Sequence, residues 1–144
     1  MVVSLAVFAV VGIALVAFGA PLGRRAFWVA ELPLIGAGVW VATQLGPVTA
    51  GDSVTEHVRW VSALDLSIDL RLDGPAATMS LVVCGVGVVV LAYAARYFAP
   101  DARDLGRLAG LLVLFAGSMV GFVQADHVIL LYTCWELTSI TSFL

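Results

Sequence analysis

Five long apolar segments follow one another along the chain, and each approaches the length of a membrane-spanning helix. A helix needs about 20 mainly apolar residues to cross the hydrocarbon core of a bilayer. The segments are Val2–Pro21, Phe27–Leu45, Pro75–Tyr97, Leu108–Ala125 and Val128–Leu144. This pattern predicts an all-α polytopic membrane protein with five transmembrane helices. Because the sequence stops inside the fifth segment, we expect that helix to be cut short and the chain to be the N-terminal piece of a longer one.

The loop between the second and third apolar segments, residues 46–74, has a different pattern. Apolar residues at positions 64, 66, 68, 70 and 72 alternate with polar residues. A strict period of two predicts a strand with one buried face. Because a single strand is not stable alone, we expect it to form a hairpin or to lie on the outer surface of neighbouring helices.

The arginines predict how the chain is oriented, because short loops rich in positive charge stay in the cytoplasm. Arg24 and Arg25 follow the first segment, and Arg96, Arg103 and Arg107 lie at or after the end of the third. The long loop instead holds two arginines against five acidic residues. We therefore expect the N-terminus and the long loop outside the cell membrane, with the two short basic loops in the cytoplasm.

The composition excludes several functional classes. Hydrophobic residues make up 62% of the chain and charged residues 12%, against about 45–50% and about 25% in soluble domains. A net charge of −3 without a basic cluster argues against a nucleic-acid partner. Cys84 and Cys134 lie in apolar runs and are interpreted as buried, unpaired thiols. With no metal-ligand spacing, phosphate-binding glycine loop or nucleophile–base pair, we expect no metal, no cofactor and no enzyme active site.

Glu136 is an acidic residue near the middle of the fifth predicted helix. It lies about 13 Å along that helix from His127. A charged side chain at the centre of a bilayer costs roughly 2.5–3.5 kcal/mol on insertion scales and usually marks an ion or proton pathway. Thr133, Ser139 and Ser142 are spaced from Glu136 in steps of three residues, so they form one polar strip with it. We expect this strip to line a proton pathway.

The alternative is that Glu136 is a structural acid, ion-paired between helices. Both interpretations need a cation, and the chain has no lysine and carries its arginines only near helix ends or in loops. The partner is therefore expected on helices beyond Leu144 or on another subunit.

Two other titratable residues carry weaker signals. Glu31 lies near the start of the second predicted helix, so we expect an interfacial acid paired with Arg24 and Arg25. Pro33, two residues later, can kink or open that helix. His127 lies at the outer mouth of the fifth helix, where a solvated loop residue and a residue that takes up protons are the two alternatives.

Small residues predict where the helices approach closely. Gly117 and Gly121 form a GxxxG pattern in the fourth predicted helix. Gly85 and Gly87 leave part of the surface of the third predicted helix without side chains. Such residues let helix backbones pack together in membranes.

Two motifs resemble a known family. Trp135–Leu144, WELTSITSFL, resembles the WELTS-x-x-SFL signature of the A-type subunit of Mrp-type multisubunit cation/proton antiporters. Arg71–Gly74, RLDG, is similar to a segment that precedes the third helix of the same proteins. The related L-type subunit of respiratory complex I usually has its matching glutamate in a W-E-G-V-G-x-x-S-Y context. The Leu-Thr-Ser that follows Glu136 therefore favours the antiporter protein.

The resemblance implies roles that the residues alone do not. Glu136 matches a glutamate that forms a proton-handling ion pair with a lysine on a later helix. The family's two inverted five-helix repeats begin at about the fourth helix, so we divide the chain into residues 1–74, with two helices and the outer loop, and residues 75–144, with the third helix and the start of a repeat. The family subunit works with several smaller subunits. Before the fifth helix the family often has Asp-Asn, whereas this chain has Asp126-His127. The resemblance therefore leaves open whether His127 takes up protons.

Three hypotheses for the function remain open. The first is the N-terminal part of an antiporter subunit that exchanges sodium, or another monovalent cation, for protons. The second is a subunit of a redox-driven proton pump of the complex I type. The third is a stand-alone membrane protein with a structural or assembly role. We expect no ion transport by these five helices alone, because they hold half a repeat and no cationic partner for Glu136.

Overall fold

The computed structural model describes residues 1–61, 66–99, 102 and 104–144. Its long helices are α1 (Val2–Phe18), α2 (Arg25–Thr43), α4 (Gly74–Tyr97), α5 (Leu105–Gln124) and α6 (Val128–Phe143). They are connected by the short segments η1 (Ala20–Leu22) and α3 (Leu45–Thr49) and by a hairpin of β1 (Val54–Val61) and β2 (Leu66–Leu72). The five predicted helices are thus present in the predicted order, with bounds that differ by a few residues.

The five helices are not equal in length. In the described part of the chain, three helices, α2, α4 and α5, are long and apolar enough to cross a membrane. The helices α1, with 17 residues, and α6, with 16 residues, are apolar but shorter. At 1.5 Å per residue they reach about 24–26 Å, a little less than the roughly 30 Å of a hydrocarbon core. The structure therefore describes a multi-pass membrane protein with three clear spans and two shorter apolar helices.

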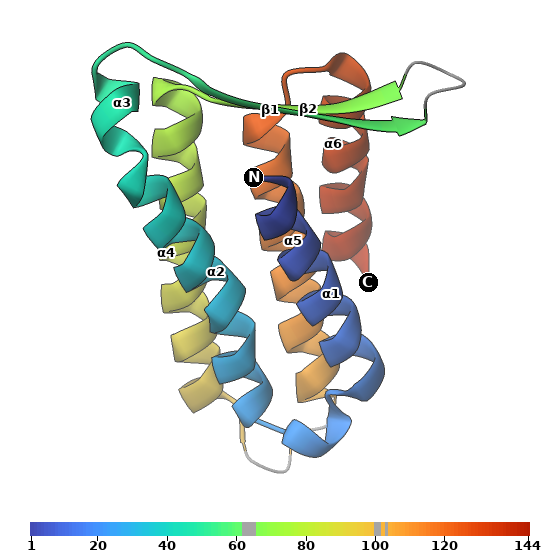
Figure 1. Ribbon diagram of the computed structural model, residues 1–144. Coiled ribbons are helices and arrows are strands. Elements are labelled where there is room, and N and C mark those ends of the chain that lie inside the picture. Colours follow the sequence, from blue (N-terminus) through green and yellow to red (C-terminus); the bar gives the residue numbers. More distant parts are fainter. Residues whose placement is uncertain (62–65, 100–101, 103) are drawn as a thin grey trace.

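The helices form two packed pairs (Figure 1). Helix α1 lies along α5, and α2 lies along α4. Helix α5 also contacts α2 and α4, which joins the pairs, and α6 packs on α5 at the edge of the bundle. A core of apolar side chains, including Phe8, Phe27 and Val113, fills the space between the first four of these helices.

Glycines at two of the predicted positions allow the helices to come close. A Cβ added to Gly117 would lie 2.5 Å from the Cβ of Phe8 on α1, and one added to Gly87 would lie 2.2 Å from Cδ2 of Leu34 on α2. Both distances are too short for real carbon atoms. At Gly117 a larger residue would have to displace the Cβ of Phe8 and with it α1, whereas at Gly87 the end of the Leu34 side chain would have to move. The expectation of close packing is confirmed at these positions. It is wrong at Gly85, where an added Cβ would meet no described neighbour within 4 Å.

The hairpin crosses one end of the bundle, as Figure 1 shows. The strands β1 and β2 pair antiparallel from Val54 opposite Leu72 to Val61 opposite Leu66, with a bulge near Arg59. Leu70 and Leu72 are buried. Their apolar neighbours under the hairpin include Val41, Val48, Ala76 and Ala77. The predicted strand and its buried face are confirmed for this part, while positions 64 and 65 of the alternation lie outside the described residues.

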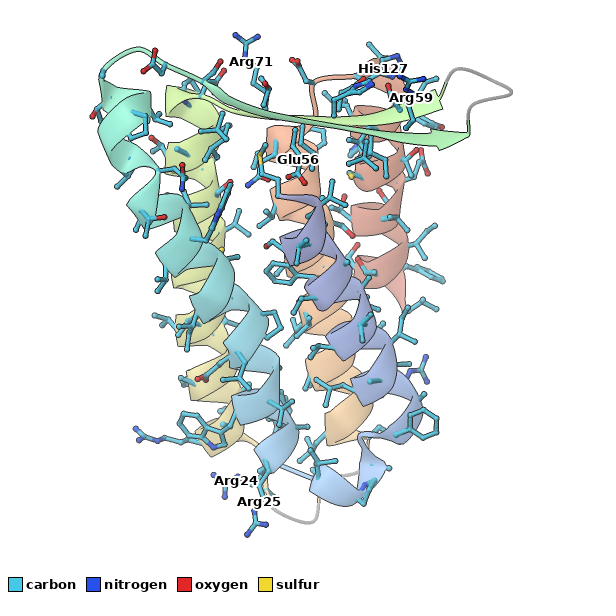
Figure 2. All side chains as sticks on the ribbon, in the orientation of Figure 1. Arg24, Arg25, Glu56, Arg59, Arg71 and His127 are labelled. Atoms are coloured by element: carbon cyan, nitrogen blue, oxygen red, sulfur yellow. The ribbon has the colours of Figure 1, made fainter. Side chains whose placement is uncertain are left out.

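Charged side chains mark the two ends of the bundle (Figure 2). Arg24 and Arg25 lie at the end opposite the hairpin, whereas Arg71 and His127 lie at the hairpin. We call these the Arg24 end and the hairpin end.

Candidate functional site

Helix α6 carries the candidate proton site, and its first turn is held by His127. The Nδ1 atom of His127 accepts a hydrogen bond from the backbone N–H of Ile129 at 3.2 Å. This bond satisfies one of the N–H groups that have no partner inside a helix at its start. His127 is therefore a structural cap of α6, a role that the sequence analysis did not assign to it.

One face of α6 packs on α5 through small side chains. Cys134 is buried, and it is the residue of α6 that is covered most completely. A Cβ added to Gly121 would lie 2.9 Å from the sulfur of Cys134, so the absence of a side chain at Gly121 makes room for the thiol. The second glycine of the GxxxG pattern thus also supports close packing, as predicted.

Glu136 points to the other side of α6. Two residues correspond to about 200° around a helix, so Glu136 lies nearly opposite Cys134. Its side chain is exposed, as are those of Thr133, Ser139 and Ser142. The four polar side chains are therefore all exposed, and they turn about 180° round α6 from Thr133 to Ser142.

The hydroxyl groups of the strip bond to their own helix rather than to Glu136. Thr133 donates to the carbonyl of Ile129 at 2.7 Å, and Ser142 donates to the carbonyl of Ser139 at 2.9 Å. Ser139 bonds in the same way to the carbonyl of Trp135 at 3.4 Å. Within the described residues Glu136 has no ion pair.

Part of the strip borders a hollow between α5 and α6 of about 380 Å³. Its lining residues are Phe115, Met119 and Phe122 on α5 and Trp135, Thr138, Ser139 and Ser142 on α6. The structure therefore places the two serines beside a hollow, whereas Glu136 and Thr133 lie outside its lining. The polar groups in this lining are the hydroxyls of Thr138, Ser139 and Ser142 and the indole N–H of Trp135.

The hairpin is attached to the start of α6 by backbone hydrogen bonds. The N–H of Asp126 donates to the carbonyl of Asp69 at 2.9 Å, and Leu70 forms a bridge with Ala125. A longer contact of 3.9 Å joins the guanidinium of Arg71 to the Asp126 carboxylate. The segment that leads into α6, the helix that carries Glu136, is thus held by β2.

Two carboxylates of the hairpin have a pKa below the usual range. Hydrogen bonds from Ser67 and then from His57 lower the pKa of Asp69. The N-terminal ammonium of Met1, 2.6 Å away, lowers the pKa of Glu56. Both groups therefore stay ionised at neutral pH at the hairpin end.

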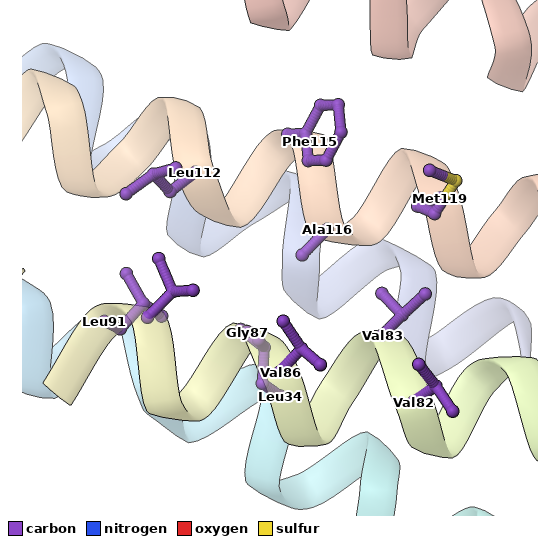
Figure 3. A pocket seen from close by; sticks show the side chains of 11 residues that line it. Leu34, Val82, Val83, Val86, Gly87, Leu91, Leu112, Phe115, Ala116 and Met119 are labelled. Atoms are coloured by element: carbon purple, nitrogen blue, oxygen red, sulfur yellow. The ribbon is translucent and has the colours of Figure 1, made fainter. Parts of the chain in front are cut away.

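The bundle also has an apolar hollow between α2, α4 and α5 (Figure 3). Its volume is about 290 Å³, and Leu34, Val83, Gly87 and Ala116 are among the residues that line it. All of the lining side chains are hydrocarbon apart from one methionine thioether. Because no lining side chain carries a charge or a strong hydrogen-bonding group, this hollow cannot bind an ion. Among the described residues, no three His, Cys, Asp or Glu side chains are close enough to hold a metal.

Glu31 has different surroundings from those that the sequence predicted. It is buried, with 6% of its surface exposed, and its Oε1 atom has no hydrogen-bond partner among the described residues. The expected pairing with Arg24 and Arg25 is wrong. Arg24 instead donates through Nε to the carbonyl of Ala95 at 2.6 Å. The reason is helical geometry, because Glu31 lies about two turns, or roughly 10 Å, from Arg24 along α2.

Comparison with known proteins finds antiporter subunits. The chain is 40% identical over 116 residues to the antiporter subunit mnhA2 of Staphylococcus saprophyticus subsp. saprophyticus. It is 34% identical over 123 residues to the protein of the same name from Staphylococcus aureus. These alignments cover 81% and 85% of this chain but only 14% and 15% of the two relatives. The chain thus spans a small part of the length of the curated proteins that it matches.

A family model and a solved structure also match this chain. Residues 59–107 match the family model described as NADH-ubiquinone oxidoreductase (complex I), chain 5 N-terminus. The fold superposes on a chain of the Mrp complex from Dietzia sp. with a TM-score of 0.84 and 33% sequence identity. That match covers 99% of this chain and 15% of the other. The resemblance to the A-type subunit of Mrp-type antiporters, stated from the sequence, is confirmed.

Proposed function

We propose that this chain is the N-terminal part of a membrane subunit of a multisubunit antiporter that exchanges Na⁺, or another monovalent cation, for protons. The observation that carries the proposal is the match to a chain of the Mrp complex, which extends over 99% of the residues at 33% identity. At this identity the similarity includes sequence as well as fold, and it spans the segment that contains Glu136. The relatives named as antiporter subunits support the same function.

In this proposal Glu136 lies in the proton path. A carboxylate inside the hydrocarbon core is costly when it is charged and alone, and it is stable either as a neutral acid or beside a cation. A movement that brings a cation near Glu136 and takes it away again would release and reload one proton. The exposed position of Glu136 on α6 supports this role, because a side chain from a further helix can reach it. Thr133, Ser139 and Ser142 would hydrate the path, and His127 would take up protons at its mouth.

The proposal includes the orientation and the partners. We place the Arg24 end in the cytoplasm and the hairpin end, with the N-terminus, outside the cell membrane. Partners would be the other subunits of a hetero-oligomeric antiporter complex. We also propose that residues 1–74 form a preceding segment, while residues 75–144 hold α4 and the start of an antiporter-like repeat.

A subunit of a redox-driven proton pump is the second candidate. The match of residues 59–107 to the complex I family model supports it. The sequence after Glu136, Leu-Thr-Ser, favours the antiporter. In both candidates the Glu136 carboxylate takes part in proton transfer. They differ in the source of energy, which is an ion gradient for the antiporter and electron transfer for the pump.

The experiment that separates these candidates uses the full complex purified from its own membrane and reconstituted into liposomes. With a proton gradient imposed, we expect addition of Na⁺ to collapse the gradient in the absence of any electron donor. Proton movement that requires NADH or a quinone, and that does not respond to Na⁺, would overturn the antiporter proposal and favour the pump.

A further inference from the structure

Glu31 is a second acidic residue inside an apolar helix, and the proposed function does not use it. Among the described residues it is the only acidic or basic side chain that is buried. Its Oε1 atom is also the only buried side-chain oxygen or nitrogen in that part of the chain without a hydrogen-bond partner. Such a group is rare in a folded protein, because burial without a partner costs free energy.

Contacts on either side of Glu31 place it at the interface of α2 and α4. Leu34 of α2 lies against Gly87 of α4, and the ring of Phe27 stacks on that of Phe98 with a centroid distance of 6.1 Å. Glu31 lies about one turn from both Phe27 and Leu34, within about 60° of each around the helix. It therefore lies between two contacts that hold α2 and α4 together.

Few charged groups are available to Glu31 from the elements that pack against α2. The titratable or charged side chains of these elements are Cys84, Tyr93, Arg96 and Tyr97 on α4 and Arg107 on α5. Helix α1 has none. No ion pair within the described residues includes Glu31.

A buried carboxyl without a cation is far more stable as a neutral acid than as an anion. Glu31 meets this condition, because it is buried and no ion pair of the described residues includes it. Pro33 lies two residues later and has no N–H, so the carbonyl of Val29 lacks its usual donor within the helix. The helix is thus weakest in the turn that contains Glu31, where a small opening would admit water.

The charged side chains closest to Glu31 along α2 are Arg24 and Arg25, at the Arg24 end. Arg24 is about 10 Å from Glu31 along α2. A hollow of about 490 Å³ opens at that end, with Arg24, Arg25 and Ala102 among its lining residues. The positive charge of the two arginines would stabilise a carboxylate that forms when Glu31 loses its proton.

We propose that Glu31 is a proton-binding site, distinct from Glu136, that exchanges its proton with water at the Arg24 end of the bundle. In the release step the O–H bond of the carboxyl breaks, the electron pair remains on the carboxylate, and the proton passes to water. The site binds a proton rather than a metal ion, because within the described part of the chain it offers one carboxyl group and no second acidic side chain.

Infrared spectroscopy of the full complex tests this site directly, because a protonated carboxyl has a carbonyl stretch that a carboxylate lacks. At neutral pH we expect Glu31→Gln to remove one such band and Glu31→Asp to shift it. Glu136→Gln should leave that band in place, so the result does not depend on the role of Glu136. Neutral-pH spectra in which neither substitution at position 31 alters the band would overturn the proposal.

Measuring the rate of Na⁺-dependent proton exchange shows whether the proton of Glu31 exchanges with water or stays bound as part of the structure. If the proton of Glu31 turns over, Glu31→Gln lowers Na⁺-dependent proton exchange by at least about tenfold, and Glu31→Asp restores part of it. Loss of the band with exchange at the wild-type rate would mean a neutral structural acid, and would overturn the proposal. Where the glutamine variant does not assemble, the aspartate variant still supplies both readouts, a shifted band and a rate.

Discussion

At the scale of single residues, the two glutamates inside apolar helices have opposite surroundings. Glu31 is 6% exposed and lies between α2 and α4, whereas Glu136 is exposed on the open side of α6. The surroundings of Glu31 are therefore formed by this chain itself. The surroundings of Glu136 depend on whatever covers α6 in the whole protein. The two residues can be tested separately for this reason.

Gly117 gives a test of packing at the same scale. Gly117→Ala places a methyl group against Phe8, where the Cβ–Cβ distance would be 2.5 Å. Overpacking of this kind costs about 1–3 kcal/mol, so we expect a lower melting temperature of the purified protein. Gly85→Ala is the matched control, because nothing described lies within 4 Å of its added Cβ. Equal melting temperatures for both variants would contradict the packing of α1 on α5.

His127 can be tested in its two roles. His127→Asn keeps a side-chain acceptor for the N–H of Ile129, whereas His127→Ala removes it. If His127 acts as a cap, hydrogen exchange in the first turn of α6 increases in the alanine variant and stays near the wild-type rate in the asparagine variant. Asparagine cannot carry a proton, so loss of antiport in His127→Asn, with α6 still protected, would indicate proton uptake.

At the scale of elements, the hairpin joins the N-terminal half of the chain to the helix that carries Glu136. Its strand β2 is buried at Leu70 and Leu72 on one face. The strand also contacts the segment before α6, because the carbonyl of Asp69 accepts from the N–H of Asp126 and Leu70 forms a bridge with Ala125. The position of the first turn of α6 therefore depends on the hairpin as well as on α5.

The pKa of Asp69 makes this element sensitive to acid. Its pKa is lowered in the folded state, first by the bond from Ser67 and then by that from His57. The stabilisation is therefore present above the ordinary value of 3.8 and is lost as the pH falls below it. We expect Asp69→Asn to speed hydrogen exchange of residues 66–72 at neutral pH, and much less so in acid.

The exposed loop residue Asp52 supplies the matched control for this prediction, because Asp52→Asn removes the same charge away from β2. An equal effect of both variants, or an effect of Asp69→Asn that persists unchanged in strong acid, would show that the ionised carboxylate does not hold the hairpin.

At the scale of the whole molecule, runs of apolar residues were sufficient to predict all five long helices and their order. The strand β2 was predicted from its alternation. Its partner β1 was not located, because the charged residue Glu56, opposite the buried Leu70, interrupts the alternation of apolar residues. The short segments η1 and α3 contain too few residues for any periodic signal.

The site was predicted less completely than the fold. The motif around Glu136 identified the strip on α6, since a polar stripe on an otherwise apolar helix is visible in the sequence. The burial of Glu31 was missed because α2 is apolar on nearly every side, so its pattern does not indicate which side faces α4. The cap formed by His127 depends on backbone geometry at the start of α6, for which a histidine gives little signal.

The orientation of the molecule gives a prediction for single cysteines. In right-side-out cells, a maleimide that cannot cross the membrane should label Asp52→Cys at the hairpin end. It should label Arg25→Cys only after the membrane is made permeable. The two buried native thiols, Cys84 and Cys134, should react weakly in both cases. Labelling of Arg25→Cys in intact cells would reverse the proposed orientation.

The most direct test of the central proposal is the rate of Na⁺-dependent proton exchange by the full complex with Glu136→Gln, reconstituted into liposomes. Glutamine keeps the size and polarity of the side chain but cannot lose a proton, so we expect exchange to fall by at least about 100-fold while the complex still assembles. Thr133→Val, a matched change one turn away, should have a smaller effect because water can replace its hydroxyl. Exchange at the wild-type rate in Glu136→Gln would remove Glu136 from the proton path, and equal loss in both variants would indicate damaged packing instead.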